Sequence, residues 1–441
     1  MKPREAEIIE LIHKEVKPAL GCTEPIAVAL AVAKAVEIIE ENCECADKEW
    51  RKTAEMEVKV EVSGNILKNG MGVGIPGTGM IGLHIAAALG AVCGKSSYGL
   101  EVLHDLDEDS IARAKEMAAT GKVNISLAQT SHKLYVKSTV SARCEHSASA
   151  EIEDDHDRIV QTWFDDKVIQ EYCGNRDSGS EDSKTTADYG LTVKEIYDFA
   201  RSVAFEDIKF ILESKDLNLT LAKEGLRGEY GLKVGKTIGS ENHRKVFGDD
   251  FLSYAMSLTA AASDARMAGC TLPAMSNSGS GNQGITVTMP VIAYCLKHKV
   301  SDEKLARALV MSHLTAIHIK GYLGKLSALC GCVVASTGSA CGIVYLEGGG
   351  YEEICAAIKN MIGNITGMVC DGAKVGCAMK VASGVSSAIQ SAVLALNGTC
   401  ISANDGIIEN DIEKTIRNLC QIGSAGMQSA DSMILNIMVC K

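Results

Sequence analysis

Apolar and polar positions follow two different periods along the chain. Residues 54–62 alternate between the two kinds, which predicts a half-buried strand, and the alternation returns between residues 121 and 172. Residues 5–41 contain two helical patterns, and from Leu191 onward the apolar positions again follow helical spacing. We therefore predict an α+β fold with a mainly helical catalytic domain and a smaller α/β domain inserted after the N-terminal helices.

Breaks in these patterns divide the sequence into four segments. Residues 1–50 hold the N-terminal helices with the turn at Cys22, and we expect them to pack on the catalytic domain. Residues 51–174 form the small α/β domain, residues 175–190 a polar linker or mobile loop, and residues 191–441 the helical catalytic domain. The helical stretches expected in the last segment are 206–226, 250–268, 285–298, 301–320, 351–367, 376–396 and 409–437.

Composition restricts the class of protein. The chain has 441 residues, enough for two or three domains, and its net charge of −12 argues against general nucleic-acid binding, which requires a basic face. The N-terminus is charged and lacks an apolar signal segment. The longest early apolar run, residues 26–35, is shorter than the roughly 20 residues that span a bilayer. We expect a cytoplasmic protein with neither a membrane nor a nucleic acid as partner.

The cysteines indicate a metal site. Eleven of the 17 lie in the last 172 residues, and in a reducing cytoplasm clustered thiols are more often metal ligands than disulfides. Cys370 and Cys377 are joined by a third candidate, Cys330 or Cys332. This spacing lacks the CxxC pairs of structural zinc sites. Three separated thiolates fit a [4Fe–4S] cluster whose fourth iron stays open as a Lewis acid.

Two glycine-rich runs match the pattern GxGxxG, at residues 72–77 and 279–284. Dinucleotide binding needs a strand directly before the run and a helix directly after it within βαβ units, and neither run has that setting. Turn formation explains the first run. The second leads directly into a helical pattern, so its backbone N–H groups and its Ser and Asn side chains would meet at a helix N-terminus, where carboxylates and phosphates bind.

Cys22 stands in a Gly-Cys-Thr-Glu-Pro turn that opens a helix. The positive end of the helix dipole lowers the pKa of a thiol, so a reactive thiolate and a small buried residue are both consistent with the sequence. Glu24 in the same turn is either a partner of the dipole or a site acid. His313 and His318 are five positions apart on one predicted helix and face different sides, which excludes the i,i+4 zinc pair.

Several longer blocks carry more specific information: GCTEPIAVALAVA, VSGNILKNGMGVGIPGTG, MSNSGSGNQGITVTMPV, KLSALCGCVVASTGSACG and NITGMVCDGAKVGCAMKV. Together they resemble the L-cysteine desulfidase family, which is related to the alpha chain of the iron–sulfur L-serine dehydratases. The resemblance covers nearly the whole chain and is weakest over residues 120–190. It implies a PLP-free lyase with an oxygen-sensitive [4Fe–4S] cluster that converts L-cysteine to pyruvate, ammonia and sulfide. It also implies Cys22 as the base and Cys330, Cys370 and Cys377 as cluster ligands, with Cys330 preferred over Cys332.

This chemistry leads to an expected set of substrate contacts. We expect the substrate carboxylate to lie against two loops and to approach the open iron while a Cys22 thiolate removes the Cα proton. The residues expected to contact the substrate are Ser63, Gly64, Asn65, Ser276, Asn277, Ser278, Gly279 and Asn282. The penultimate residue, Cys440, is either a frayed tail thiol or, as the resemblance implies, a reversible cap on the open iron.

Two other functions stay open at this point. An L-serine dehydratase would use the same cluster chemistry with hydroxide in place of sulfide as the leaving group. A non-catalytic iron–sulfur or zinc protein, such as a redox sensor, would hold the metal without turnover. For either enzyme the partner is a small amino acid, and helical proteins of this size often assemble as homodimers.

Overall fold

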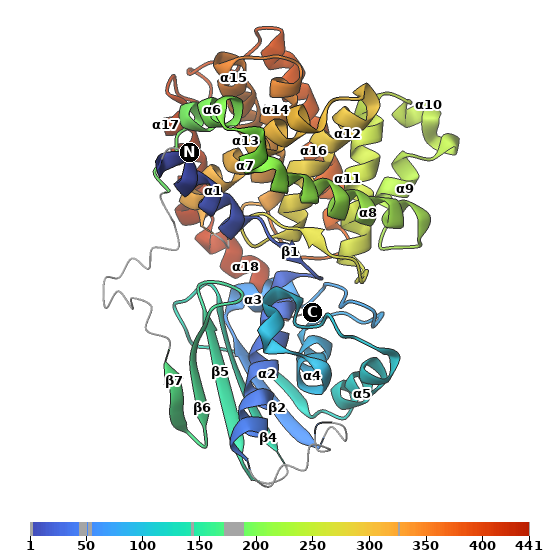
Figure 1. The fold of residues 1–441 in the computed structure, drawn as a ribbon, viewed down its shortest axis with the longest axis vertical. Helices are drawn as coiled ribbons and strands as arrows, with labels where there is room; N and C mark the ends of the chain where they lie inside the picture. Colours follow the sequence, from blue (N-terminus) through green and yellow to red (C-terminus); the bar gives the residue numbers. More distant parts are fainter. Residues whose placement is uncertain are drawn as a thin grey trace.

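The chain folds around two hydrophobic cores. The computed structural model describes residues 3–43, 51, 55–142, 145–171, 189–324 and 327–440. The larger core lies among helices, and the smaller core lies between a sheet and the helices that cover it. Figure 1 shows them as an upper helical unit and a lower α/β unit. The predicted α+β, mainly helical fold is therefore confirmed.

The α/β unit is a six-stranded sheet covered on one face by helices. Its strand order is β3-β2-β4-β5-β6-β7, in which β2 and β3 are parallel and the other neighbours are antiparallel. The strands are β2 (Met56–Val62), β3 (Val123–Leu127), β4 (Tyr135–Ala142), β5 (Ser147–Glu153), β6 (Ile159–Phe164) and β7 (Lys167–Glu171). The helices are α2 (Thr23–Asn42), α3 (Gly64–Gly70), α4 (Leu83–Cys93) and α5 (Glu108–Ala119). Every second residue of β2 is buried, as its alternation predicted.

The helical unit is arranged around α14 (Gly331–Leu346), which packs against four other helices, α12, α13, α15 and α16. The unit begins with α1 (Pro3–Glu15), and its other elements follow residue 190. They are α6 (Val193–Ser202), α7 (Phe205–Ile208), α8 (Glu213–Arg227), α9 (Val234–Ile238), α10 (Arg244–Phe247), α11 (Phe251–Met267), α12 (Gly281–His298), α13 (Asp302–Leu323), α15 (Tyr351–Ile365), α16 (Cys377–Leu396), α17 (Ile412–Gln421) and α18 (Gln428–Val439).

The two N-terminal helices belong to different units, which corrects the expectation that both pack on the catalytic domain. Helix α1 contributes Ile8 and Ile12 to the core of the helical unit. Helix α2 packs against α4 and the sheet, because its Ala, Val, Ile and Leu residues are buried around most of its circumference. Between them, β1 (Pro18–Ala19) pairs antiparallel with β8 (Ala274–Met275) of the helical unit.

One segment differs from the expected pattern, and another lies mostly outside the described residues. The sequence predicted no helix at α14, because this helix is buried on all sides and is rich in Gly, Ser, Thr and Cys. A Cβ at Gly338 would overlap the Ser312 carbonyl of α13, so the small residues permit close helix packing. Most of the predicted linker, residues 175–188, lies outside the described residues, and residues 189–190 have no regular structure.

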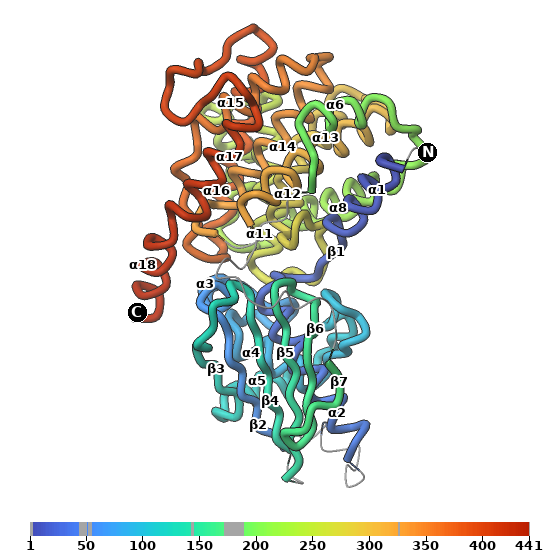
Figure 2. Tube along the Cα trace, turned by 90° about the vertical axis from the view of Figure 1, so that its left-hand side faces the viewer, coloured from blue at the N-terminus to red at the C-terminus, as the bar shows by residue number. Residues whose placement is uncertain are grey.

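Helix α18 lies against the side of the molecule and ends near α3 (Figure 2). None of its residues is buried, yet the ammonium group of Lys68 on α3, whose side chain is 1% exposed, forms an ion pair with Asp431 of α18.

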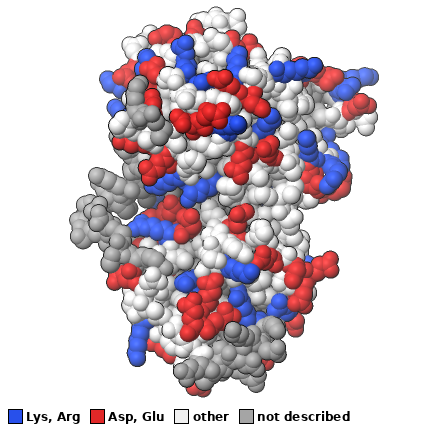
Figure 3. Space-filling model, viewed as in Figure 1, with Lys and Arg blue, Asp and Glu red and all other residues white. Residues whose placement is uncertain are grey.

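Helix α16 is the one described helix that is long and apolar enough to span a membrane, but half of it is buried against α11, α14 and α15. On the face in Figure 3, basic and acidic residues are interspersed.

Candidate functional site

A cavity of about 120 Å³ lies where the two units meet. Its walls come from the start of α2, the end of α11, the loop before α12 and the two segments around Cys330 and Cys370. The polar and cysteine residues that line it are Cys22, Thr23, Glu24, Asn69, His156, Arg266, Ser278, Ser280, Asn282, Gln283, Thr286, Lys320, Ser327, Cys330, Cys332, Cys370, Cys377 and Lys380. The candidate base Cys22, both alternatives Cys330 and Cys332, and the expected ligands Cys370 and Cys377 therefore all line one cavity.

Short backbone contacts bring two of the three expected cluster cysteines together. The backbone N–H of Cys330 donates to Met368 O at 3.0 Å, and that of Cys370 donates to Ala328 O at 2.6 Å. This pairing of two loops sets Cys330, at the start of α14, beside Cys370. Cys377 begins α16 after a turn of six residues. The three thiols thus come from the helical unit alone.

The arrangement of the cysteines fits a cluster better than a single zinc ion. Zinc–sulfur bonds of about 2.3 Å in a tetrahedron place the sulfurs about 4 Å apart. Within the described ranges, the one group of three or more His, Cys, Asp or Glu ligand atoms lying within 4.8 Å of one another does not include these cysteines. A [4Fe–4S] cluster takes one thiolate on each iron, so it accepts sulfurs that are farther apart. Cys330, Cys370 and Cys377 are the residues that would hold such a cluster, with one iron left open.

Cys332 has a different environment from Cys330, although both line the cavity. Its thiol donates to the Lys380 carbonyl at 3.1 Å and packs directly on Gly384 of α16. Burial raises the pKa of Cys330 to about 12 and that of Cys332 well above its usual value, and in Cys330 the neighbouring Cys370 adds to the effect. The contact with Lys380 makes Cys332 the less available of the two sulfurs.

Cys22 is buried at the N-terminal end of α2. Burial raises the pKa of its thiol to about 12, and the nearby guanidinium of Arg266 offsets part of this increase. The sequence had suggested a lowered pKa from the helix dipole, and that expectation is wrong because the loss of hydration is the larger effect. Cys22 packs with Val73 and Met267, and Cys377 contacts the same small cluster.

The loop before α12 and the first turn of that helix supply three of the eight expected substrate contacts. Ser278, Gly279 and Asn282 line the cavity, and the Ser280 side chain caps α12 by accepting from the Gln283 N–H at 3.3 Å. Ser276 and Asn277 do not line it. The Ser276 hydroxyl donates to Lys17 O at 2.6 Å. The Asn277 amide donates to the ring of His313 at 2.9 Å, so both side chains position the loop.

The other three expected contacts, Ser63, Gly64 and Asn65, also do not line the cavity. The Ser63 hydroxyl donates to Lys133 O at 2.8 Å, and a Cβ at Gly64 would overlap Leu435 of α18. This corrects the sequence-based assignment: the segment joins β2 to α3 and contacts α18. The residue of α3 that reaches the cavity is Asn69, five positions after Gly64.

Several cavity residues have no motif that would have identified them from the sequence. Arg266 lies at the end of α11, and Lys320 near the end of α13. His156 is buried and comes from the turn between β5 and β6. Burial lowers the pKa of Lys320 to about 8, and the nearby Cys370 and Cys330 oppose this change. Helices from distant parts of the sequence converge here, so only the fold reveals these residues.

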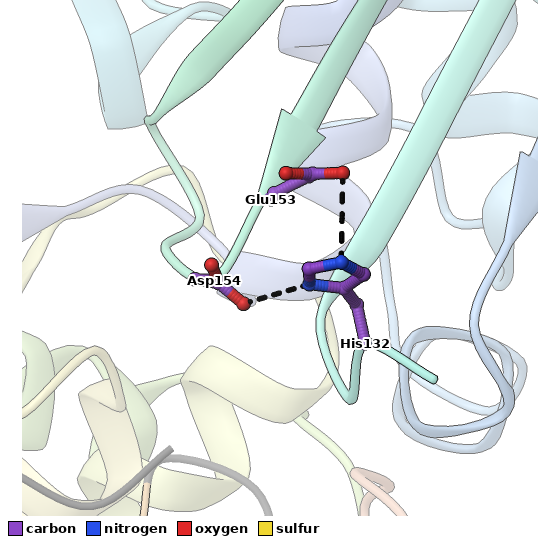
Figure 4. Close-up of side chains that lie close together, drawn as sticks. All are labelled: His132, Glu153 and Asp154. Atoms are coloured by element: carbon purple, nitrogen blue, oxygen red, sulfur yellow. Dashed lines mark hydrogen bonds and ion pairs between the residues drawn. The ribbon is translucent and has the colours of Figure 1, made fainter. Parts of the chain in front are cut away.

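His132, Glu153 and Asp154 form the group of potential ligands noted above, which lies outside this cavity (Figure 4). The His132 Nδ1 atom is 3.1 Å from Asp154, and its Nε2 atom is 3.8 Å from Glu153. The carboxylates thus face different edges of the imidazole ring. One metal ion binds one ring nitrogen, so this geometry fits a histidine bridging two carboxylates better than a chelate.

The thiol of Cys440 is exposed at the end of α18 and does not line the cavity. The capping role implied by the resemblance would require the end of α18 to move, and it stays a prediction.

Comparison with known proteins extends these observations. Residues 97–436 match the serine dehydratase alpha chain family. A UPF0597 protein of Oleidesulfovibrio alaskensis is 49% identical, over 100% of this chain and 99% of the relative. A UPF0597 protein of Phocaeicola vulgatus is 48% identical with the same coverage, and one of Shewanella pealeana is 44% identical over 98% of each chain.

Proposed function

The chain belongs to the serine dehydratase alpha chain family, and from this membership we propose that it is a PLP-independent [4Fe–4S] lyase acting on L-cysteine. The products would be pyruvate, ammonia and hydrogen sulfide. The observation that carries the proposal is the meeting of Cys330, Cys370 and Cys377 with Cys22 on one cavity. A cluster of this kind also fits a protein of the reducing cytoplasm.

The proposed reaction is an α,β-elimination. When bound, the cluster held by Cys330, Cys370 and Cys377 supplies a Lewis-acidic iron. Burial raises the pKa of the Cys22 thiol to about 12, so this thiol first gives up its proton, and the resulting thiolate accepts the Cα proton of L-cysteine. The electrons of the broken C–H bond form the Cα–Cβ double bond, and the C–S bond breaks so that sulfide leaves with its electron pair. The released aminoacrylate tautomerises to an imine, which one water molecule hydrolyses to pyruvate and ammonia.

The alternative substrate is L-serine, which the name of the matching family favours. The same residues would then expel hydroxide. Anaerobically purified protein with a verified iron–sulfur absorbance should be assayed with each amino acid in turn. We expect sulfide and pyruvate in equal amounts from L-cysteine. Pyruvate from L-serine alone would assign the dehydratase reaction, and no product from either amino acid would contradict the proposal.

A further inference from the structure

A carboxylate on the cavity wall has no ionic partner. Glu24, in the first turn of α2, accepts a hydrogen bond from the Asn69 amide at 3.1 Å and lies 3.2 Å from the Thr23 hydroxyl. Both partners are neutral. Throughout the part of the chain that the structure describes, no Lys, Arg or His side chain forms an ion pair with Glu24.

A guanidinium on the same wall also lacks an anionic partner. Arg266, only 4% exposed, donates to the Gly21 carbonyl at 2.8 Å and to the Asn282 side chain at 3.3 Å. Its Nε atom is buried and has no hydrogen-bond partner among the described residues. The thiol of Cys22 is its other neighbour on the cavity wall. Buried charges are normally paired, so this arrangement indicates a missing anion.

Two neutral acceptors complete the wall. Asn69 Oδ1 and Gln283 Oε1 are buried and have no hydrogen-bond partner among the residues that the structure describes, and both residues line the cavity. Each amide has its orientation fixed, because Asn69 donates to Glu24 and the Gln283 amide nitrogen donates to Asn277 at 2.8 Å. A Cβ at Gly331 would lie 3.1 Å from Gln283 Oε1, so this acceptor lies at the end of the cavity near the cysteines.

We propose that Glu24 and Arg266 form an ionic clamp that binds the α-ammonium and the α-carboxylate of the substrate, respectively. A zwitterion supplies the two missing charges at once, which a simple acid or a simple amine does not. Asn69 Oδ1 provides a second acceptor for the ammonium group. With both charges held, the β-substituent is left to face Gln283 and the cysteines. The clamp deepens the proposed function and rests on it. It assigns specificity to Glu24 of the Gly-Cys-Thr-Glu-Pro turn and to Arg266, which lies in no motif.

The test compares ligands that keep or lose each charge. L-Alanine has both charges but no leaving group, propionate lacks the ammonium, and ethylamine lacks the carboxylate. Binding to the anaerobically purified protein can be measured by calorimetry at constant cluster content. Glu24→Gln should weaken L-alanine binding about 10- to 100-fold, as expected for losing a hydrogen bond between charged groups, and leave propionate binding unchanged. Arg266→Gln should weaken L-alanine and propionate by the same factor.

Further variants separate a local effect from misfolding. Arg266→Lys keeps the charge but loses the forked donor geometry, and it should weaken L-alanine binding less than Arg266→Gln does. Gly281→Ala should also weaken it, because the added Cβ would overlap the Arg266 guanidinium. Glu37→Gln is the matched control: its carboxylate also lies on α2 but accepts from the Ser96 N–H at 2.7 Å, outside the cavity, so binding should stay unchanged.

The outcomes distinguish the clamp from the lyase reaction. Selective binding of L-alanine that is lost in both variants supports the clamp even when L-cysteine is not turned over. If the protein turns over L-cysteine but Glu24→Gln does not change L-alanine binding, the clamp is wrong and the lyase proposal stands. Equal weakening of L-alanine and propionate by Glu24→Gln, or equal affinity of the wild-type protein for these two ligands, also overturns it.

Discussion

His313 shows how burial fixes the charge state of a single residue. Its ring is fully buried in α13, accepts a hydrogen bond from the Asn277 amide and lies 3.5 Å from the Ser214 hydroxyl. Burial lowers its pKa from 6.5 to about 3, so the ring stays neutral in the folded protein at all ordinary pH values. This neutral imidazole holds the loop that carries Ser278 and Gly279 into the cavity.

Stability should therefore depend on pH through His313. Below pH 6.5 the unfolded chain binds a proton at this residue and the folded chain does not, so the stability present above pH 6.5 falls as the pH decreases toward 3. The slope is about 1.4 kcal/mol per pH unit. Urea unfolding between pH 7 and 4.5 should show a shallower loss for His313→Gln than for the wild type. His104→Gln, at an exposed position, should leave the slope unchanged, and identical slopes for all three proteins would contradict the prediction.

The cysteines of the cavity allow a second test at this scale. Replacing Cys330, Cys370 or Cys377 by Ala should each abolish iron and sulfide content and turnover, whereas Cys332→Ala should retain the cluster, because its thiol already donates to Lys380 O. Cys22→Ala should keep the cluster and lower kcat by about 10²- to 10⁴-fold, as expected for loss of a general base. Cys355→Ala, buried outside the cavity, is the control. If Cys332→Ala loses the cluster and Cys330→Ala keeps it, then Cys332 is the cluster ligand and Cys330 is not.

Single residues also show where sequence reasoning succeeds. The cysteines and the loop at residues 278–282 were recognisable because their chemistry is carried by contiguous blocks. The pKa of Cys22 was not, since a helix dipole worth about 0.3–1 kcal/mol changes a pKa by less than one, whereas burial raises it from 9.0 to about 12. Arg266 and Asn69 were missed because only tertiary packing brings them to the cavity.

At the scale of elements, close helix contacts depend on glycine. Helices α2 and α4 cross where a Cβ at Gly90 would overlap the backbone of Ala29. Sequence periodicity predicted α2 but not this crossing, and it missed α14, where burial on every side removes the amphipathic pattern. Helix α14 was missed because its small and polar residues add no apolar stripe to a helix that is buried throughout.

Gly90→Ala should destabilise the α/β unit. The gain in helix propensity is about 1 kcal/mol, but the backbone of Ala29 cannot move aside as a side chain would, so we expect a net loss of about 1–3 kcal/mol. Gly367→Ala, whose Cβ would have no heavy atom within 4 Å, should change stability little. Chemical unfolding of the two variants compares them directly, and equal stabilities would refute the overlap.

At the scale of the whole molecule, an ion pair between Lys68 and Asp431 holds the C-terminal helix α18 against α3. Asp431→Asn leaves the buried ammonium of Lys68 without its partner, which costs about 3–5 kcal/mol when the structure cannot relax. Because α18 has no buried residues, its release is the easiest relaxation. Amide hydrogen exchange in α18 should accelerate by up to about 100-fold, with α14 unaffected. Asp198→Asn, in an exposed pair with Lys194, serves as control. Equal acceleration of amide exchange in α14 and α18 would indicate that Asp431→Asn destabilises the whole protein, and this would contradict the prediction.

The position of α1 has a consequence for how the protein is made. This helix leaves the ribosome first, yet its docking partners on α13 follow about 290 residues later. At about 5–20 residues per second, roughly 15–60 s pass between the synthesis of α1 and that of α13. The α/β unit, whose described elements lie between residues 23 and 171, is fully translated during this interval. The order of synthesis therefore differs from the order of assembly, and a nascent chain stalled before α13 carries a finished sheet beside an N-terminal helix that still lacks its contacts with α13.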